Sequence, residues 1–187
     1  MVVLAEVVEF GSPKGWEYTI GGEPQTWWRV PITNRKDPVD LTVRVASITP
    51  EVRLIVPNSR LHRMGDDPPD GKYVGVTTLQ HDETAWFDVV SMSPRVPGFS
   101  GGGVVTNTSS SNTQIYWSGG KTWPMAVDFC IRTVDRPDYR MLVELDGTYD
   151  ITLSAHFGSK SRTRTYRLEA DAQRRVLTMS DLAKSRR

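Results

Sequence analysis

Alternation of apolar and polar residues near the C-terminal end is the feature that most constrains how this chain can fold. In the segment YDITLSAHF at 149–157, apolar or small residues recur at every second position, and the residues between them are polar. A period of two places the apolar side chains on one face of a β-strand and the polar ones on the other. Gly158–Ser161 supplies a turn, and Arg162–Leu168 returns as a partner strand. The sequence therefore predicts a β-hairpin with one buried and one solvated face.

The same alternation recurs along most of the chain, whereas helical spacing of apolar residues is absent outside the short tail. Residues 28–32 and 39–45 flank a turn at 34–38 and are predicted to form two antiparallel strands. Further strands are predicted at residues 2–10, 16–20, 53–56, 73–79, 85–90, 114–117, 125–133 and 141–144. We therefore predict an all-β fold, an antiparallel two-sheet β-sandwich.

The chain has 187 residues, the size of one ordinary domain. Hydrophobic residues make up 38% of it, which supplies enough apolar surface for a core and excludes wholesale disorder. We predict a single sandwich domain over residues 1–187. It carries a long Gly-, Ser- and Pro-rich loop at 91–113, either a flexible insertion or a binding loop, and a basic tail at 179–187.

Charge and cysteine content limit which binding partners and which cellular compartment can be expected. The formal net charge of +1 gives no basis for bulk binding to nucleic acid or to a membrane surface. Glu6 interrupts the first apolar run, which is expected to be a strand rather than a signal peptide, and no stretch has the roughly 20 apolar residues that span a bilayer. The single cysteine, Cys130, fits a reducing compartment. The expected localisation is cytoplasmic, with a virion as the alternative.

The motif LDGTYDI at 145–151 resembles the tyrosine corner of immunoglobulin-like and fibronectin type III-like sandwiches. The resemblance implies that Gly147 lies in a small turn and that the Tyr149 hydroxyl bonds to backbone just upstream, which makes both residues structural. The segment WWRVPITNRKDPVDLTVRVASI at 27–48 also looks like the strand-turn-strand opening of such domains. The missing cysteine pair and a length well above the roughly 100 residues of one such domain leave a jelly roll open as the alternative.

Candidate catalytic groups are few. His62, His81 and His156 are the only imidazoles, and His81 precedes Asp82 and Glu83, but their spacing matches no metal motif even with Asp66 added. No activating base lies near Cys130 in the sequence, and Gly101–Gly103 lacks the Lys and Ser or Thr of a phosphate loop. We therefore predict no catalytic site, no cofactor and no metal, and expect the protein not to be an enzyme.

Positive charge gathers in the C-terminal part. Residues 160–187 hold nine Lys or Arg against three Asp or Glu, a local charge of +6 that leaves −5 for residues 1–159. Arg162, Arg164 and Arg167 are the predicted partner-binding residues, with Tyr166 and Leu168 of the same strand facing the core. The alternative is an edge strand whose charges block strand-to-strand aggregation.

Tryptophan is abundant, with six in the chain. Trp117 and Trp123 flank a hairpin-like turn and are a second predicted contact for a partner or ligand, although packing in the core or at an interface is the favoured alternative. Trp27 and Trp28 are adjacent, so in a strand they point to opposite faces.

The predicted function is a non-enzymatic binding or scaffold module for protein–protein recognition or self-assembly. Its partner is expected to be another protein or a neighbouring subunit of a homo-oligomer; membrane insertion and nucleic-acid binding are not expected. A structural protein of a viral or phage particle and a lectin-like ligand-binding domain stay open as alternatives.

Overall fold

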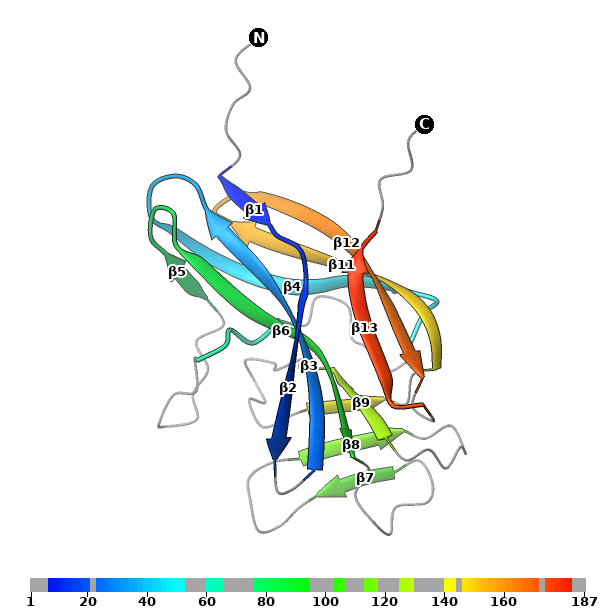
Figure 1. Ribbon diagram of the computed structural model, residues 1–187. Helices are drawn as coiled ribbons and strands as arrows, with labels where there is room; N and C mark the ends of the chain where they lie inside the picture. The colour runs from blue at the N-terminus through cyan, green and yellow to red at the C-terminus, as the bar shows by residue number, and fades with distance from the viewer. Residues whose placement is uncertain are drawn as a thin grey trace.

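The structure, a computed structural model, describes the residues in ten ranges and shows two β-sheets (Figure 1). The ranges are 7–20, 23–52, 60–65, 76–94, 103–106, 113–117, 125–129, 140–143, 146–171 and 174–182. Every regular element within them is a β-strand, which confirms the all-β prediction. Within the same ranges no helix is long and apolar enough to cross a membrane.

The larger sheet contains eight strands. They are β1 (Val8–Phe10), β2 (Lys14–Ile20), β3 (Glu23–Asn34), β6 (Thr84–Pro94), β7 (Gly103–Thr106), β8 (Thr113–Trp117), β9 (Met125–Phe129) and β10 (Arg140–Val143). Their order is β1-β3-β6-β9-β10-β8-β7, and β2 also pairs with β3. All pairs are antiparallel except β8 with β10, which are parallel.

The second sheet is antiparallel throughout, in the order β13-β12-β11-β4-β5. Its strands are β4 (Val39–Thr49), β5 (Thr77–Leu79), β11 (Asp146–Phe157), β12 (Lys160–Asp171) and β13 (Val176–Asp181). The predicted C-terminal hairpin is present as β11 and β12, joined by a two-residue turn at Gly158 and Ser159. Gly158 has a φ of 56°, which favours glycine.

The hydrophobic core lies between the two sheets. The larger sheet contributes Val30, Ile32 and Phe87 among others, and the second sheet contributes residues such as Leu41 and Leu153, all at most 2% exposed. The predicted alternation of β11 and β12 is confirmed, since the inward residues of both strands belong to this cluster. Two facing sheets with one shared core are consistent with a β-sandwich.

The predicted pairing of residues 28–32 with 39–45 is wrong, because β3 and β4 belong to different sheets. The turn after Asn34 carries the chain from one sheet to the other. The buried Asn34 side chain explains this geometry: its amide nitrogen lies within 3.2 Å of four backbone carbonyls, those of Lys36, Asp37, Leu79 and Gln80. It thereby joins the β3–β4 turn to the end of β5.

The predicted loop at 91–113 and tail at 179–187 are partly strand. β6 continues to Pro94 because Ser91 and Met92 are buried opposite Trp27 and Thr26 of β3, and β7 occupies Gly103–Thr106 within the predicted loop. β13 likewise runs to Asp181, so Met179 is core. Residues 95–102, 107–112 and 183–187 lie outside the described residues.

Residues 60–65 connect the two sheets on one side of the sandwich. The Leu61 amide donates to the Val43 carbonyl of β4 at 2.8 Å. On the β6 side, the Asp88 amide donates to the His62 carbonyl at 2.9 Å and the Met64 amide donates to the Trp86 carbonyl at 2.8 Å. This segment therefore fixes His62 beside Asp88.

Candidate binding surface

An aromatic surface lies on the outer face of β2, β3 and β6. The cross-strand pairs Lys14–Arg29 and Trp16–Trp27 join β2 to β3, and Arg29–Asp88 and Pro31–Trp86 join β3 to β6. Directly paired residues project to the same side of a sheet, so these side chains form one array. The aromatic surface comprises Lys14, Trp16, Tyr18, Trp27, Arg29 and Trp86.

Alternation along the strands determines which side chains reach this surface. In β3, Trp28, Val30 and Ile32 point into the core or pack against it, so Trp27 and Arg29 point outward. A register shift in the β3–β6 ladder next to Arg29 leaves the consecutive residues Val89 and Val90 both fully buried.

A buried ion pair lies beneath the rings. Arg29 Nε donates to Asp88 Oδ1 at 2.5 Å, and the two side chains are only 8% and 6% exposed. The second carboxylate oxygen of Asp88 lies 3.0 Å from His62 Nδ1. Burial alone would lower the pKa of Arg29, but hydrogen bonds to Asp88 and Tyr18 outweigh it and raise that pKa, so the guanidinium stays charged.

Aromatic rings surround the guanidinium. Its central carbon lies 5.0 Å from the ring centre of Trp16, 5.4 Å from that of Tyr18 and 5.7 Å from that of Trp27. Arg29 Nη1 also donates to the Tyr18 hydroxyl at 2.6 Å. The Trp16 and Trp86 rings meet edge to face at 4.9 Å across the Arg29–Asp88 row, which explains how an ion pair on an outer sheet face is shielded from water.

This arrangement suits contact with a macromolecule better than reaction chemistry. Tyr18 is 39% exposed and the Trp rings are partly exposed, while Arg29 of the ion pair below lies against the rings of Trp16, Tyr18 and Trp27. The indole N–H groups of Trp16 and Trp86 donate to no acceptor among the described residues. Because Arg29 already fills the space between the rings, the surface offers no empty cage for a second cation. In the described part of the chain, no three metal-ligating side chains gather.

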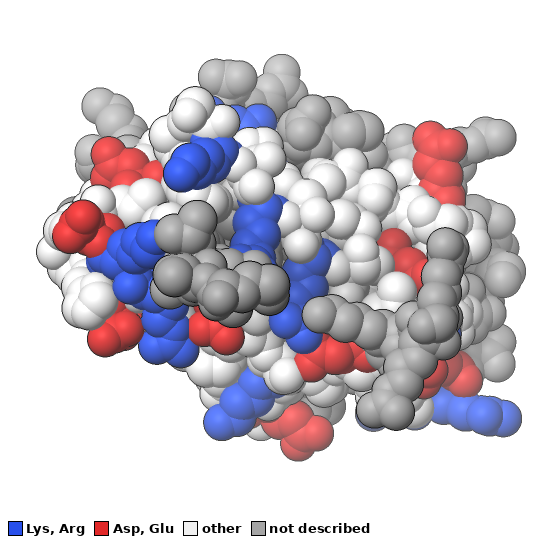
Figure 2. Space-filling model, turned by 90° about the horizontal axis from the view of Figure 1, so that it is seen from above, with Lys and Arg blue, Asp and Glu red and all other residues white. Residues whose placement is uncertain are grey.

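The predicted basic contact residues make bonds within the chain. Arg162 Nη1 donates to the Val8 carbonyl at 3.2 Å and Arg164 Nη1 donates to the Phe10 carbonyl at 3.1 Å, so both side chains tie β12 to β1. Arg167 binds the Asp150 carboxylate through two nitrogens, at 3.0 and 3.3 Å. On the face shown in Figure 2, basic and acidic side chains lie next to one another rather than in one continuous basic area.

The two predicted structural residues differ in their settings. Gly147 has a φ of 114°, in the region that favours glycine, but it lies within β11 opposite Ala170 rather than in a preceding turn. Tyr149 is half-buried and packs against the core. Tyr166, fully buried, donates its hydroxyl to the Gly11 carbonyl at 2.9 Å, a bond from β12 to the segment between β1 and β2 that the sequence did not indicate.

The structure places the other candidates apart from one another. The backbone of Trp117 ends β8, and its side chain, like the whole of Trp123, lies outside the described residues, as do Asp66 and Cys130. His81 is exposed in the β5–β6 turn beside Asp82, whereas His62 is buried beside Asp88. His156 is exposed on β11 and hydrogen-bonds Ser154 at 2.9 Å.

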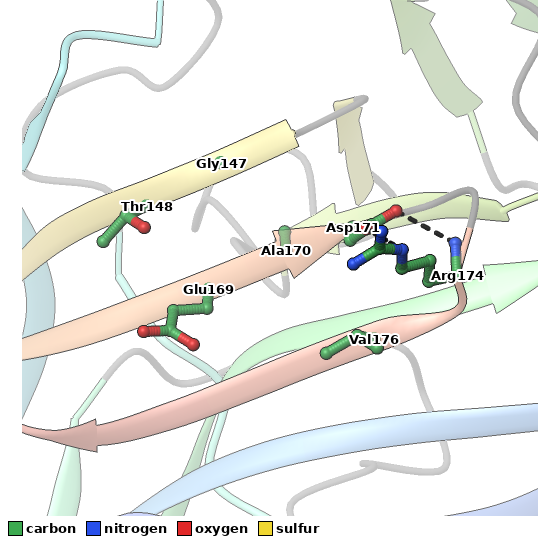
Figure 3. Close-up of a pocket in the computed structure, with 7 residues that line it drawn as sticks. All are labelled: Gly147, Thr148, Glu169, Ala170, Asp171, Arg174 and Val176. Carbon is green, nitrogen blue, oxygen red and sulfur yellow. Dashed lines mark hydrogen bonds and ion pairs between the residues drawn. The ribbon is translucent and has the colours of Figure 1, made fainter.

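A depression of about 280 Å³ lies at the end of β11, β12 and β13 (Figure 3). Arg174 on its rim bonds to Asp171, through its backbone amide at 2.9 Å and its side chain at 3.5 Å. Its other lining residues include Thr148, Glu169 and Val176, all exposed. This is an open surface hollow with no buried polar group aimed into it among the described residues.

The sequence pattern did not indicate the Arg29–Asp88–His62 group. Alternation did place Trp27 and Arg29 opposite the core face of Trp28 and Val30, which was the signal that could have revealed an outer aromatic array. Comparison of this chain with protein-family models, with curated proteins and with solved structures finds no match.

Proposed function

We propose that this protein is a non-enzymatic recognition or scaffold module that binds another protein chain through its aromatic surface. The observation that carries the proposal is the set of partly exposed rings held over the buried Arg29–Asp88 pair. Trp, Tyr and Arg are the residues most enriched where protein interfaces concentrate their binding energy. Rings that are already ordered also lose little conformational entropy on binding.

A lectin-like role is less well supported by the same residues. Flat stacking of a sugar needs an open ring face, and Trp16 already contacts Arg29 and Trp86, with Lys14 Nζ 5.3 Å from its ring centre. An edge-to-face pair at an interplanar angle of 88° presents a step rather than a flat platform. Such a step suits the side chains of a protein partner.

The proposal includes an immunoglobulin-like arrangement of the sandwich. The crossing of the chain between sheets after Asn34 and the C-terminal β11–β12 hairpin support it. The parallel β8–β10 pair is a departure from that pattern. A jelly roll is the competing arrangement, and an experimental structure would distinguish the two by strand order.

Site-specific photo-crosslinking in the native host tests the proposed function. A benzophenone amino acid replaces Lys14 or Thr84, which lie on the outer face of β2 and β6. The matched control replaces Thr163, an exposed residue on the solvated face of β12. We expect protein adducts from positions 14 and 84 and none from 163. Absence of adducts at positions 14 and 84, or equal yields at all three, would show the proposal to be wrong.

A further inference from the structure

Several strand edges of the sandwich are covered by the chain itself. The outward carbonyls of Val8 and Phe10 in β1 accept hydrogen bonds from Arg162 and Arg164. In β13, the Leu177 carbonyl accepts from Trp28 Nε1 at 2.8 Å. Residues 60–65 bond to the edge of β6 at Trp86 and Asp88. Covered edges prevent uncontrolled strand addition.

The edge of β2 differs from these edges. Among the described strands β2 pairs only with β3, and Figure 1 shows it at the border of the sheet. The Arg35 amide bonds to Val7 and the Gly11 amide bonds to Pro31, so odd-numbered residues of β3 face β1 and β2. Lys14, Trp16 and Tyr18 therefore bond to β3. Gly15, Glu17 and Thr19 turn their N–H and C=O groups outward, and no described residue bonds to them.

We propose that a second copy of this chain adds to the edge of β2 that no other described strand covers, giving a dimer with an antiparallel β2–β2 pair centred on Trp16. This inference rests on the proposed function and names one partner for the β2 border of the aromatic surface. A two-fold axis perpendicular to the sheet makes such a contact self-complementary. It also places the aromatic surfaces of the two copies side by side on one continuous sheet face.

Repulsion between like charges disfavours two registers of the β2–β2 pair. Full overlap of β2 with its copy is centred on Glu17 and sets two carboxylates directly opposite each other, and a pair centred on Lys14 does the same with two ammonium groups. Centring on Trp16 avoids both. Lys14 then lies opposite the partner's Tyr18, an ammonium next to an aromatic ring, and Glu17 lies opposite the partner's Gly15.

The same register satisfies the outward backbone groups. Gly15 and the partner's Glu17 exchange two N–H to C=O bonds, and symmetry repeats them on the other side of the axis. The two Trp16 residues form the non-hydrogen-bonded pair at the centre, where opposed side chains are closest. Cross-strand aromatic pairs of this kind stabilise sheets.

Oligomeric state of the purified protein tests the dimer. Light scattering and sedimentation over a concentration series are expected to show a dimer for the unchanged chain. Glu17→Pro removes an outward N–H without touching a bond to β3, and is expected to give a monomer. The matched control Glu17→Ala keeps the N–H and is expected to stay dimeric. A monomer at every concentration of the unchanged chain, or a dimer unaffected by Glu17→Pro, would overturn the proposal.

A disulfide test reads the register directly and does not depend on the proline variant folding. In a Cys130→Ser background, Lys14→Cys combined with Tyr18→Cys places each cysteine opposite its mate in the other copy. Oxidation is expected to yield a covalent dimer whose linking peptide joins positions 14 and 18. Lys14→Cys with Thr19→Cys sets the thiols on opposite faces and is the control that should stay uncrosslinked.

Failure of the disulfide pair in a protein whose circular dichroism is unchanged would contradict the register and so the proposal. The proposed function has a separate readout. Photo-adducts with other proteins at positions 14 and 84, together with a monomeric purified chain, would support recognition and reject self-pairing.

Discussion

Arg29 and Asp88 face each other across β3 and β6 on the outer side of their sheet, yet their side chains are only 8% and 6% exposed. The Trp16 and Trp86 rings, which meet at 4.9 Å, shield the pair. β3 and β6 therefore bury an ion pair on the outer face of the sheet, which is normally exposed to solvent in a sandwich. Arg29 of this pair also lies against the rings of Trp16, Tyr18 and Trp27, so the arrangement of the aromatic surface depends on the pair.

Asp88→Asn is expected to destabilise the protein by about 3 to 5 kcal/mol, because it leaves the Arg29 guanidinium buried without its counter-charge. The free energy of unfolding from urea denaturation measures the effect. Asp150→Asn is the matched control, since the Arg167–Asp150 pair is 44% and 36% exposed. The free energy of unfolding of that variant should fall by no more than about 1 kcal/mol. Equal losses in the two variants would contradict the structural role assigned to the buried pair.

Local sequence patterns predicted where the strands lie better than which strands pair with one another. The alternation at 149–157, the turn after Phe157 and the return strand are all encoded within one short segment, and the hairpin is present as predicted. The pairing of β3 with β6 joins residues more than 50 positions apart, and nothing in either strand indicates its neighbour. Arg29 and Asp88 were each recognisable as outward residues, but not as a pair.

The arginines of the basic hairpin likewise show that alternation predicts the face of a strand but not its neighbours in the fold. Alternation correctly placed Tyr166 and Leu168 in the core and left Arg162 and Arg164 on the same face towards the open end of the sheet. It could not show that β1 lies there and offers its carbonyls. The partner-binding surface inferred from the concentration of positive charge stays a prediction, and the structure adds that Arg162 and Arg164 bond to β1 of the other sheet.

Tyr166→Phe is expected to lower the free energy of unfolding by about 1 to 2 kcal/mol. The ring still fills the core, but the Gly11 carbonyl loses the hydroxyl that donates to it at 2.9 Å. Chemical denaturation gives the value. A midpoint identical to that of the unchanged chain would show that this bond contributes nothing to stability.

The stability of the unchanged chain should fall at alkaline pH. Burial raises the pKa of Tyr166 well above its usual value of about 10. A group whose pKa is raised on folding stabilises the fold fully below the unfolded-state pKa and loses that contribution as pH rises beyond it. Urea midpoints measured from about pH 8 to pH 11 should therefore drop more steeply for the unchanged chain than for Tyr166→Phe. Parallel curves would contradict this assignment.

Gly15→Ala is expected to destabilise the protein by about 1 to 3 kcal/mol through overpacking. A Cβ at position 15 would lie 3.0 Å from a ring atom of Trp28. That ring cannot easily move, because its Nε1 donates to the Leu177 carbonyl at 2.8 Å. Thr19→Ala, an exposed change in the same strand, serves as the control and should alter the unfolding midpoint little. An unchanged unfolding midpoint for Gly15→Ala would show that the Trp28 ring shifts freely.

Arg162→Met combined with Arg164→Met tests whether the basic hairpin is structural. Both changes keep an apolar stem but remove the donors to the Val8 and Phe10 carbonyls, so β1 should detach more readily from β12. We expect a loss of about 1 to 3 kcal/mol in the free energy of unfolding and faster hydrogen–deuterium exchange in residues 8–11. Arg167→Met removes charge from the same strand, but among the described residues Arg167 hydrogen-bonds only Asp150, so this variant should leave exchange in β1 unchanged. If the double variant exchanged like the unchanged chain, the bonds of the two arginines to β1 would not hold that strand, and the structural role would be wrong.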